Sequence, residues 1–418
     1  MTQNNNIFFN IIIPTKNRKE TLQYTLKCFD SQNYQNYQII ILDNNSKDGT
    51  AKYIQKLTNK NIIYENSNKD LPMNENWERG LKFCTKGYVC VVGDDDGFLP
   101  NAFKKLDIFL QQNKTQIVSW HANTYYWPNI DSVKRNNVEI YFSGSNAKFT
   151  KHSSNETLKR ILDMSILYLE IPMIYNSFVD VNLINSIKFK KKSNIFFSNG
   201  IPDVYSGMAF LLNSKYFYKV NFPVGLSGIS KSSGGALFGK ENKSIKDIIA
   251  NNKYFNITTV PPIPSYYLSI LEPFNELCKE FEHANNYNVN FYRLKMRVIS
   301  EIKKENKQNY EFYIQKLSLF LKEFKKKYSL YRKFIIFCNL FKITFYPVAN
   351  RIILKLDNDT KDIYDASLAI QSKYEFFTKN KISKIKMIDK KLLLSNYFRK
   401  IGIYNIVLTV LRALKISI

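Results

Sequence analysis

Short apolar runs alternate with longer amphipathic segments through the first 120 residues of the chain. Runs of strand length are predicted as buried strands, and segments with apolar residues at helical spacing are predicted as helices. The predicted strands cover residues 7–14, 38–42, 62–64, 88–92 and 116–120. The predicted helices cover residues 20–32, 46–57, 74–83 and 100–112. This alternation predicts βαβ units and a doubly wound, mostly parallel α/β sheet, with an irregular α+β domain as the alternative.

The pattern beyond residue 120 is less regular and then becomes helical. It predicts a loop or hairpin over 125–145, helices over 154–168 and 204–212, and a Gly/Ser-rich loop over 225–239. From residue 270 onward, apolar stripes alternate with Lys-rich faces, which indicates a mainly helical C-terminal domain. Because 418 residues exceed one ordinary core, we predict three parts. They are residues 1–120 and 121–265, as two halves of one α/β domain, and residues 270–418.

The formal net charge is +26, and it is concentrated toward the C-terminus. Residues 271–418 contain 29 Lys and Arg against 14 Asp and Glu. Such an excess attracts polyanions, including nucleic acids and anionic membranes. Residues 398–418 pair apolar positions with flanking basic ones, which favours an anionic membrane surface as a partner. An acidic glycan, a partner enzyme, or a plain Lys-rich helical domain are the alternatives.

The cysteine spacing and the hydropathy of the chain indicate the cellular compartment. The five cysteines lack C-x-x-C spacing, which indicates reduced thiols in a cytosolic protein. The first residues lack the basic region of a secretory signal, and the apolar stretch 334–348 contains Lys342 and is too short to span a bilayer. We therefore expect a cytoplasmic protein, soluble or peripheral on the inner face of the membrane.

Three consecutive carboxylates, Asp94, Asp95 and Asp96, directly follow the predicted strand 88–92. The carboxyl ends of strands are where open α/β sheets bind their ligands. Adjacent carboxylates repel one another, and hard oxygen ligands of this kind suit Mg²⁺ or Mn²⁺, which in turn bind phosphates. The triplet therefore predicts a divalent-cation site, with a solvated acidic turn as the alternative.

A further carboxylate, Asp43, ends the second predicted strand. It is placed to accept a hydrogen bond from a base imide or a ribose hydroxyl. Asp48, in the turn that follows, is interpreted as structural, because an Asp-Gly-Thr sequence commonly turns the chain and caps the next helix.

Four segments follow one another along the chain: IIIPTKNR, IILDNNSKDGT, the NWERGL helix and YVCVVGDDDGFLP. In this order they resemble family 2 glycosyltransferases of the GT-A fold. The resemblance is close over residues 7–120 and looser to about residue 240. It implies a nucleotide-diphosphate sugar donor, with a UDP-sugar favoured, and Mn²⁺ or Mg²⁺ as the cofactor. Residues 1–120 would then bind the donor, and residues 121–265 would bind the acceptor.

The same resemblance implies roles for individual residues. Those around the nucleotide would be Pro14, Thr15, Asn17, Arg18, Asp43 and Asn45. Asp94 would face the ribose, Asp95 would be the principal metal ligand and Asp96 would support it. Gly93 stands where the family's acidic string usually begins, so the division of labour among the three carboxylates stays open.

A general base is also implied, because direct inverting displacement needs one for the acceptor hydroxyl. Asp203 matches the family's base in position, ahead of a predicted helix, although Pro202 replaces the acid often found before it. A helix N-cap is the alternative role for Asp203. The implied activity is that of a hexosyltransferase acting on a glycan or lipid-linked acceptor in capsule or lipooligosaccharide biosynthesis.

Two other function classes fit the sequence less well. A nucleotidyltransferase would carry a Gly-rich phosphate loop, and residues 14–19 contain no glycine. A nucleic-acid-binding protein is suggested by charge alone, and none of the common binding signatures is present, so no nucleic acid is expected as a partner. The segment 228–235 is either a loop that closes over a diphosphate, with Lys231 as a contact, or an ordinary loop.

Overall fold

The structure is a computed structural model. It describes residues 6–121, 123–130, 135–141, 148–231, 233, 263, 265–305, 310–322, 351–356 and 360–379. The chain separates into two compact units, residues 1–369 and 370–418. The text below concerns the first unit, because only residues 370–379, the end of one helix, are described in the second. The three-part division at residues 120 and 270 stays a prediction.

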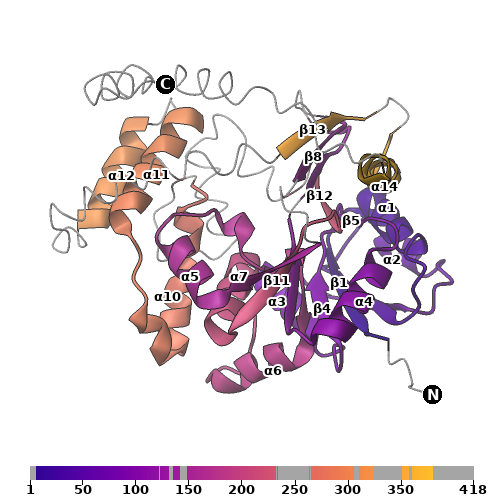
Figure 1. The fold of residues 1–418 in the computed structure, drawn as a ribbon, viewed down its shortest axis with the longest axis horizontal. Helices are drawn as coiled ribbons and strands as arrows, with labels where there is room; N and C mark the ends of the chain where they lie inside the picture. The colour runs from indigo at the N-terminus through magenta and orange to yellow at the C-terminus, as the bar shows by residue number, and fades with distance from the viewer. Residues whose placement is uncertain are drawn as a thin grey trace. The chain divides into compact units, whose positions relative to one another are not determined.

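A large eight-stranded sheet forms the centre of the first unit (Figure 1). Its strand order is β3-β2-β1-β4-β10-β6-β11-β9. The strands are β1 (Phe9–Thr15), β2 (Tyr37–Asp43), β3 (Ile62–Asn66), β4 (Tyr88–Val91), β6 (Ile117–Trp120), β9 (Phe149–Ser153), β10 (Ser177–Asp180) and β11 (Tyr216–Val220). The first four run parallel, whereas β10 is antiparallel to both β4 and β6. The predicted α/β class with a mostly parallel sheet is confirmed.

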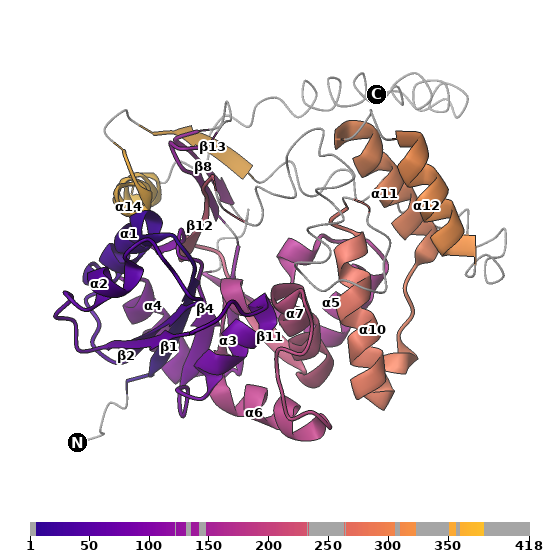
Figure 2. The ribbon, with the colours of Figure 1, turned by 180° about the vertical axis from the view of Figure 1, so that it is seen from behind.

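Helices cover both faces of this sheet, as Figure 1 and Figure 2 show. They are α1 (Lys19–Asp30), α2 (Thr50–Ile54), α3 (Met73–Leu81), α4 (Ala102–Asn113), α5 (Ser154–Leu162), α6 (Val181–Lys190) and α7 (Pro202–Asn213). Alternate residues of β1 point to opposite faces, as strand geometry requires. Ile11 and Ile13 pack in one core with α1 and α4, whereas Ile12 packs in a second core with α3, α5, α6 and α7.

Two predicted helices are too long. The segment predicted as a helix over 46–57 is helical only over α2, because Asp48 and Gly49 form the turn that precedes it. Asp48 Oδ1 accepts a hydrogen bond from Thr50 N at 3.1 Å, so the structural role expected for Asp48 is confirmed. The helix predicted over 154–168 ends at Leu162, and Tyr168–Glu170 forms a separate 3-10 turn.

A second, five-stranded sheet was not predicted. Its order is β13-β8-β7-β12-β5, with β5 (Gly97–Phe98), β7 (Asn123–Tyr126), β8 (Asn137–Tyr141), β12 (Gly225–Ile229) and β13 (Arg351–Lys355). β7 and β8 pair in antiparallel fashion, which confirms the predicted hairpin. The prediction of a loop over 225–239 is wrong for 225–229, because β12 is held between β5 and β7. β12 thus returns the chain to the residues that follow the acidic triplet.

The region after residue 265 is helical over most of its described part. It contains the 3-10 turns η3 (Leu268–Ile270) and η4 (Glu282–Asn286) and the helices α10 (Leu271–Glu280), α11 (Phe291–Glu305), α12 (Tyr310–Lys322) and α14 (Ile363–Lys379). Strand β13 interrupts the helical pattern. Segments 334–348 and 398–418 lie outside the described residues. Within the part of the chain that the structure describes, no helix is both long and apolar enough to cross a membrane.

One glycine sets the position of β4 beside β1. Gly87 has a φ of +74°, and a Cβ at this position would lie 2.1 Å from the carbonyl oxygen of Phe8. The neighbouring Tyr88 N donates to the same oxygen at 2.8 Å, and Tyr88 is the register partner of Phe9. The close approach at Gly87 therefore fixes the β1–β4 register that brings the end of β4 beside the end of β1.

We expect Gly87→Ala to destabilise the protein more than Gly49→Ala. Gly49 also has a positive φ, +87°, but the atom nearest to a Cβ added there is 4.0 Å away. The control variant Gly49→Ala should therefore show only the backbone penalty of about 1–2 kcal/mol. Gly87→Ala adds a clash with backbone, which we expect to cost about 1–3 kcal/mol more. Urea unfolding of the two variants measures the difference, and equal stabilities would contradict this account of the β1–β4 contact.

Candidate functional site

The carboxyl ends of β1, β2 and β4 lie side by side at one edge of the large sheet. Thr15, the last residue of β1, is the register partner of Asp43, the last residue of β2. Asn44 N donates to the carbonyl oxygen of Thr15 at 2.8 Å, and Val92 N donates to that of Ile12 at 2.8 Å. The loops that follow the three strands therefore start next to one another, as the βαβ pattern predicted.

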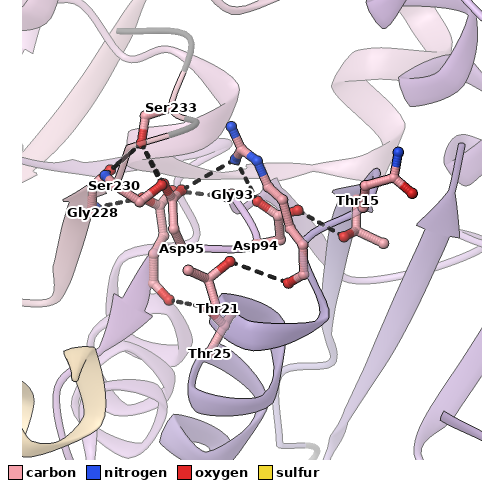
Figure 3. Close-up of polar contacts among 12 residues, drawn as sticks. Thr15, Thr21, Thr25, Gly93, Asp94, Asp95, Gly228, Ser230 and Ser233 are labelled. Carbon is pink, nitrogen blue, oxygen red and sulfur yellow. Dashed lines mark hydrogen bonds and ion pairs between the residues drawn. The ribbon is translucent and has the colours of Figure 1, made fainter. Parts of the chain in front are cut away.

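Asp94 bridges the triplet to β1 (Figure 3). Its Oδ2 accepts a hydrogen bond from Thr15 Oγ1 at 2.7 Å, and its Oδ1 accepts one from Arg18 Nη1 at 2.7 Å. The carboxylate is buried, with 2% of the residue exposed. Burial alone would lower the pKa of Arg18, but the nearby Asp94 and Asp95 carboxylates raise it. The guanidinium is thus the charged partner that lets Asp94 stay ionised inside the protein.

Asp95 is held from the opposite side, by the segment that follows β12. Its Oδ2 accepts hydrogen bonds from Ser230 Oγ, at 2.6 Å, and from Ser233 Oγ. Its backbone oxygen accepts one from Trp127 Nε1 at 3.0 Å. Arg18 Nη1 approaches Asp95 Oδ1 only to 3.8 Å. Asp95 is therefore oriented mainly by neutral donors.

Asp96 is bound by backbone groups. Its Oδ1 accepts a hydrogen bond from Gly228 N at 2.7 Å, and its Oδ2 accepts one from Gly93 N at 2.8 Å. A Cβ on Gly228 would lie 1.8 Å from the backbone oxygen of Asp95, so only glycine permits this approach of β12. Burial, followed by repulsion from Asp95, raises the pKa of Asp96.

The electrostatics of the triplet favour a cation. Burial raises the pKa of Asp94 as well, against the opposing attraction of Arg18. Three carboxyl groups are thus crowded around one guanidinium, and both shifts mean that the ionised forms lack compensating positive charge. A divalent ion would supply that charge.

The donor set fits a hard divalent ion that completes its shell with other ligands. A Cβ on Gly93 would lie 2.9 Å from Asp96 Oδ2 and 3.1 Å from Asp95 Oδ1, so these two oxygens lie close to Gly93 and near each other. No group of three or more His, Cys, Asp or Glu side chains suited to a metal occurs among the described residues. Mg²⁺-type ions are commonly held by one or two carboxylates together with substrate phosphates and water, so two carboxylates suffice.

Next to the triplet, the loops after β1 and β2 are tied together. Asp43 is buried, and its two carboxylate oxygens accept hydrogen bonds from Ser46 N at 2.9 Å and Tyr64 Oη at 2.7 Å. Asn17 N donates to Ser46 Oγ at 2.8 Å. Asn45 lies farther out, where its Nδ2 donates to Asp70 Oδ1 at 3.1 Å. Of the predicted nucleotide residues, Thr15, Arg18 and Asp94 are in direct contact. Pro14 is half-buried beside them on β1.

A pocket opens on the other side of Asp96, lined in part by Trp120, Tyr175 and Asn176. Asn176 is buried, and its Oδ1 has no hydrogen-bond partner among the described residues. Tyr175 and Asn176 belong to the 3-10 turn η2 (Ile174–Asn176). This turn connects the pocket to the region of Asp203.

Asp203 lies in the first turn of α7, behind η2. Ser206 Oγ donates to the carbonyl oxygen of Asp203 at 2.6 Å and accepts from Ile174 N at 3.0 Å. Ile201 occupies the N-cap position of α7, without a side-chain capping bond. Burial raises the pKa of the Asp203 carboxyl, while the adjacent backbone N–H of Val204 opposes the shift. Among the described residues, no hydrogen bond or ion pair joins Asp203 to the triplet.

Sequence reasoning did not assign the groups that hold Asp95 and Asp96 from across the molecule. These are Trp127, Gly228, Ser230 and Ser233. The Gly/Ser-rich composition of 228–235 was the available signal, and it pointed to a loop near a diphosphate rather than to contacts with the triplet. Lys231, the residue expected to reach a phosphate, is exposed, and its backbone N donates to Asn129 Oδ1 at 3.2 Å.

Comparison with known proteins agrees with this geometry. Residues 10–178 match the family model described as glycosyl transferase family 2. A GalNAc(5)-diNAcBac-PP-undecaprenol beta-1,3-glucosyltransferase of Campylobacter jejuni is 30% identical over 99 residues, which is 23% of this chain and 32% of that protein. The amylovoran biosynthesis glycosyltransferase AmsB of Erwinia amylovora is 30% identical over 97 residues, 22% of this chain and 31% of that protein.

The chain therefore spans about a third of the length of these curated relatives. A solved structure of S. aureus TarS residues 1–349 in complex with UDP-GlcNAc is similar over 81% of this chain and 80% of that one, at 12% identity. The TM-score of this pair is 0.45. The match over residues 10–178 covers β1, β2, β4 and the acidic triplet. Residues 10–178, which are less than half of the chain, are therefore similar to glycosyl transferase family 2.

Proposed function

We propose that the protein is a metal-dependent, inverting glycosyltransferase. It transfers a hexose-type sugar from a nucleotide-diphosphate donor, with UDP favoured, to a glycan or lipid-linked acceptor in capsule or lipooligosaccharide biosynthesis. The observation that carries this proposal is the convergence of Asp94, Asp95 and Asp96 with Thr15 and Arg18 at the edge of the sheet where Asp43 also ends its strand.

The donor's nucleotide is assigned to the loops after β1 and β2. Asp43 is the group for a base imide or ribose hydroxyl, because it is a buried carboxylate at the end of a parallel strand. Pro14, Thr15, Asn17 and Asn45 border the same loops. Asp94 lies between this nucleotide side and the rest of the triplet, which suits contact with the ribose.

The cofactor is assigned to Asp95 and Asp96. Asp95 Oδ1 and Asp96 Oδ2 lie close together near Gly93, and among the described residues the cationic partner of this part of the triplet is Arg18, 3.8 Å from Asp95. Mn²⁺ or Mg²⁺ bound there would neutralise the negative charge that develops on a departing diphosphate.

The general base is assigned to Asp203. A carboxyl whose pKa is raised above the usual aspartate range accepts a proton more readily than an ordinary surface aspartate. The assignment is supported by Ser206, which links the backbone oxygen of Asp203 to Ile174 of η2, the turn whose Tyr175 and Asn176 line a pocket next to Asp96.

The setting is proposed from the relatives and the charge. One relative is named for an undecaprenol-linked acceptor and the other for amylovoran biosynthesis, so a bacterial glycan is the natural class of acceptor. The net charge of +26 favours a protein on the cytoplasmic side that associates with an anionic membrane surface.

A panel of UDP-, GDP-, dTDP- and CMP-sugars with Mn²⁺ tests the donor. We expect UDP-sugars to raise the melting temperature most, because a ligand that binds only the folded state stabilises it in proportion to its affinity. Asp43→Asn should reduce this shift. No shift with any nucleotide sugar would contradict the proposed donor class.

Asp95→Ala should abolish Mn²⁺-dependent hydrolysis or transfer of the donor sugar, because the cation would lose a charged ligand. Asp30→Ala is the matched control, since Asp30 is an exposed carboxylate at the end of α1 and should leave turnover unchanged. Turnover and urea unfolding are measured together. A folded Asp95→Ala variant with wild-type turnover would remove the triplet from the reaction.

Asp203→Asn should lower kcat by about 10²-fold or more, with little change in donor binding. Only the ionised carboxyl can accept a proton, so wild-type kcat should fall as pH drops through a pKa above the ordinary aspartate value of 3.8. This acid limb should be absent from the residual activity of the variant. Asp180→Asn is the control, because Asp180 caps α6 through Asn182 N at 2.8 Å and has no proposed chemical role. Equal losses in the two variants would indicate a structural role for Asp203.

A further inference from the structure

Two serine hydroxyls from the segment after β12 converge on one oxygen of Asp95 (Figure 3). Ser230 and Ser233 follow Asp95 by 135 and 138 residues and are 2% and 7% exposed. Ser230 N donates to Ser233 Oγ at 2.7 Å, and Ser233 N donates to the carbonyl oxygen of Ser230 at 3.1 Å. The two serines thus form a turn that fixes the second hydroxyl as a donor toward Asp95.

Both hydroxyls bind Oδ2, which determines the direction of the other oxygen. Oδ1 lies beside Gly93, as Asp96 Oδ2 does. Rotating the carboxylate away from this arrangement would break two hydrogen bonds to a charged acceptor in a buried site, and such bonds are stronger than neutral ones. The serines therefore hold Oδ1 beside Gly93, near Asp96 Oδ2.

The chemical nature of the donors matters as much as their placement. Asp94 is neutralised by the guanidinium of Arg18 at 2.7 Å, whereas the hydroxyls of Ser230 and Ser233 carry no charge. A neutral donor orients a carboxylate and leaves its negative charge available. Arg18 Nη1 is 3.8 Å from Asp95 Oδ1, so Asp95 is oriented by the hydroxyls and is less neutralised than Asp94, as a ligand for a cation requires.

We propose that Ser230 and Ser233 are positioning residues that set the affinity of this site for a divalent cation. They act through Asp95 and do not contact the cation themselves. The inference rests on the proposed function, in which Asp95 is the principal metal ligand. Because the serines follow β12, the affinity of the cation site is coupled to the placement of the second sheet against the triplet.

The test measures Mn²⁺ binding without turnover. The full-length chain is titrated with Mn²⁺ in the presence of UDP, and free Mn²⁺ is followed by electron paramagnetic resonance. We expect Ser230→Ala and Ser233→Ala each to weaken Mn²⁺ binding, and the double variant to raise the Kd for Mn²⁺ about 10- to 100-fold, the usual effect of losing groups that orient a metal ligand.

The matched control is Ser154→Ala/Ser214→Ala. This pair also loses two buried or half-buried hydroxyls, which lie 2.8 Å from each other at the start of α5 and the end of α7. It should bind Mn²⁺ as the wild type does. Ser233→Thr keeps the hydroxyl and should restore most of the affinity that Ser233→Ala loses.

Asp95→Ala distinguishes the two proposals. Wild-type Mn²⁺ affinity in Asp95→Ala, or no Mn²⁺ binding by the wild type with UDP, would overturn the metal assignment and the serine role together. Loss of binding in Asp95→Ala, with unchanged or tighter binding in folded Ser230→Ala and Ser233→Ala, would overturn the serine role alone. Urea unfolding identifies any variant that fails to fold. If the double serine variant fails to fold, the two single variants decide the outcome.

Discussion

The site depends on how the protein tolerates three adjacent carboxylates, two buried and one half-buried, beside the guanidinium of Arg18. Asp94 accepts a hydrogen bond from the guanidinium of Arg18. Asp96 accepts hydrogen bonds from two backbone N–H groups, and Asp95 accepts them from two serine hydroxyls. Burying an ionised carboxylate is costly unless it is paired or hydrogen-bonded, so each needs its own donors. Together these donors hold the acidic groups in place but do not cancel their charge, and the remaining negative potential favours a divalent cation.

This requirement explains why the site at the edge of the large sheet needs hydrogen-bond donors from the second sheet. The donors to Asp95 and Asp96 come from β12 and the turn after it, far along the chain from β4. β12 pairs with β5, which directly follows the triplet, so the strand pairing and the hydrogen bonds to the carboxylates stabilise the same approach. The absence of a side chain at Gly228 allows the contact.

The sequence predicted what depends on local pattern. The strands β1, β2 and β4 were visible as apolar runs, and polar residues directly after them were therefore placed at one edge of the sheet. β12 was not predicted, because two of its five residues are glycine and strand preference depends on packing with partners that a sequence does not show. The serine contacts to Asp95 were missed for the same reason. They follow from the pairing of β12, not from any feature of residues 230–233 themselves.

The separation of Asp203 from the triplet follows from the different demands of the two proposed tasks. A carboxylate that binds a cation must stay ionised, which nearby positive charge and hydrogen-bond donors promote. A carboxylate that accepts a proton needs a higher pKa, which burial without a charged partner provides. Bound cations lower the pKa of groups near them, so a base within the triplet would lose proton affinity when the cation binds. Burial raises the pKa of Asp94 and Asp96 as well as that of Asp203, but Asp203, on α7 beyond η2, would keep its raised pKa when a cation binds at the triplet.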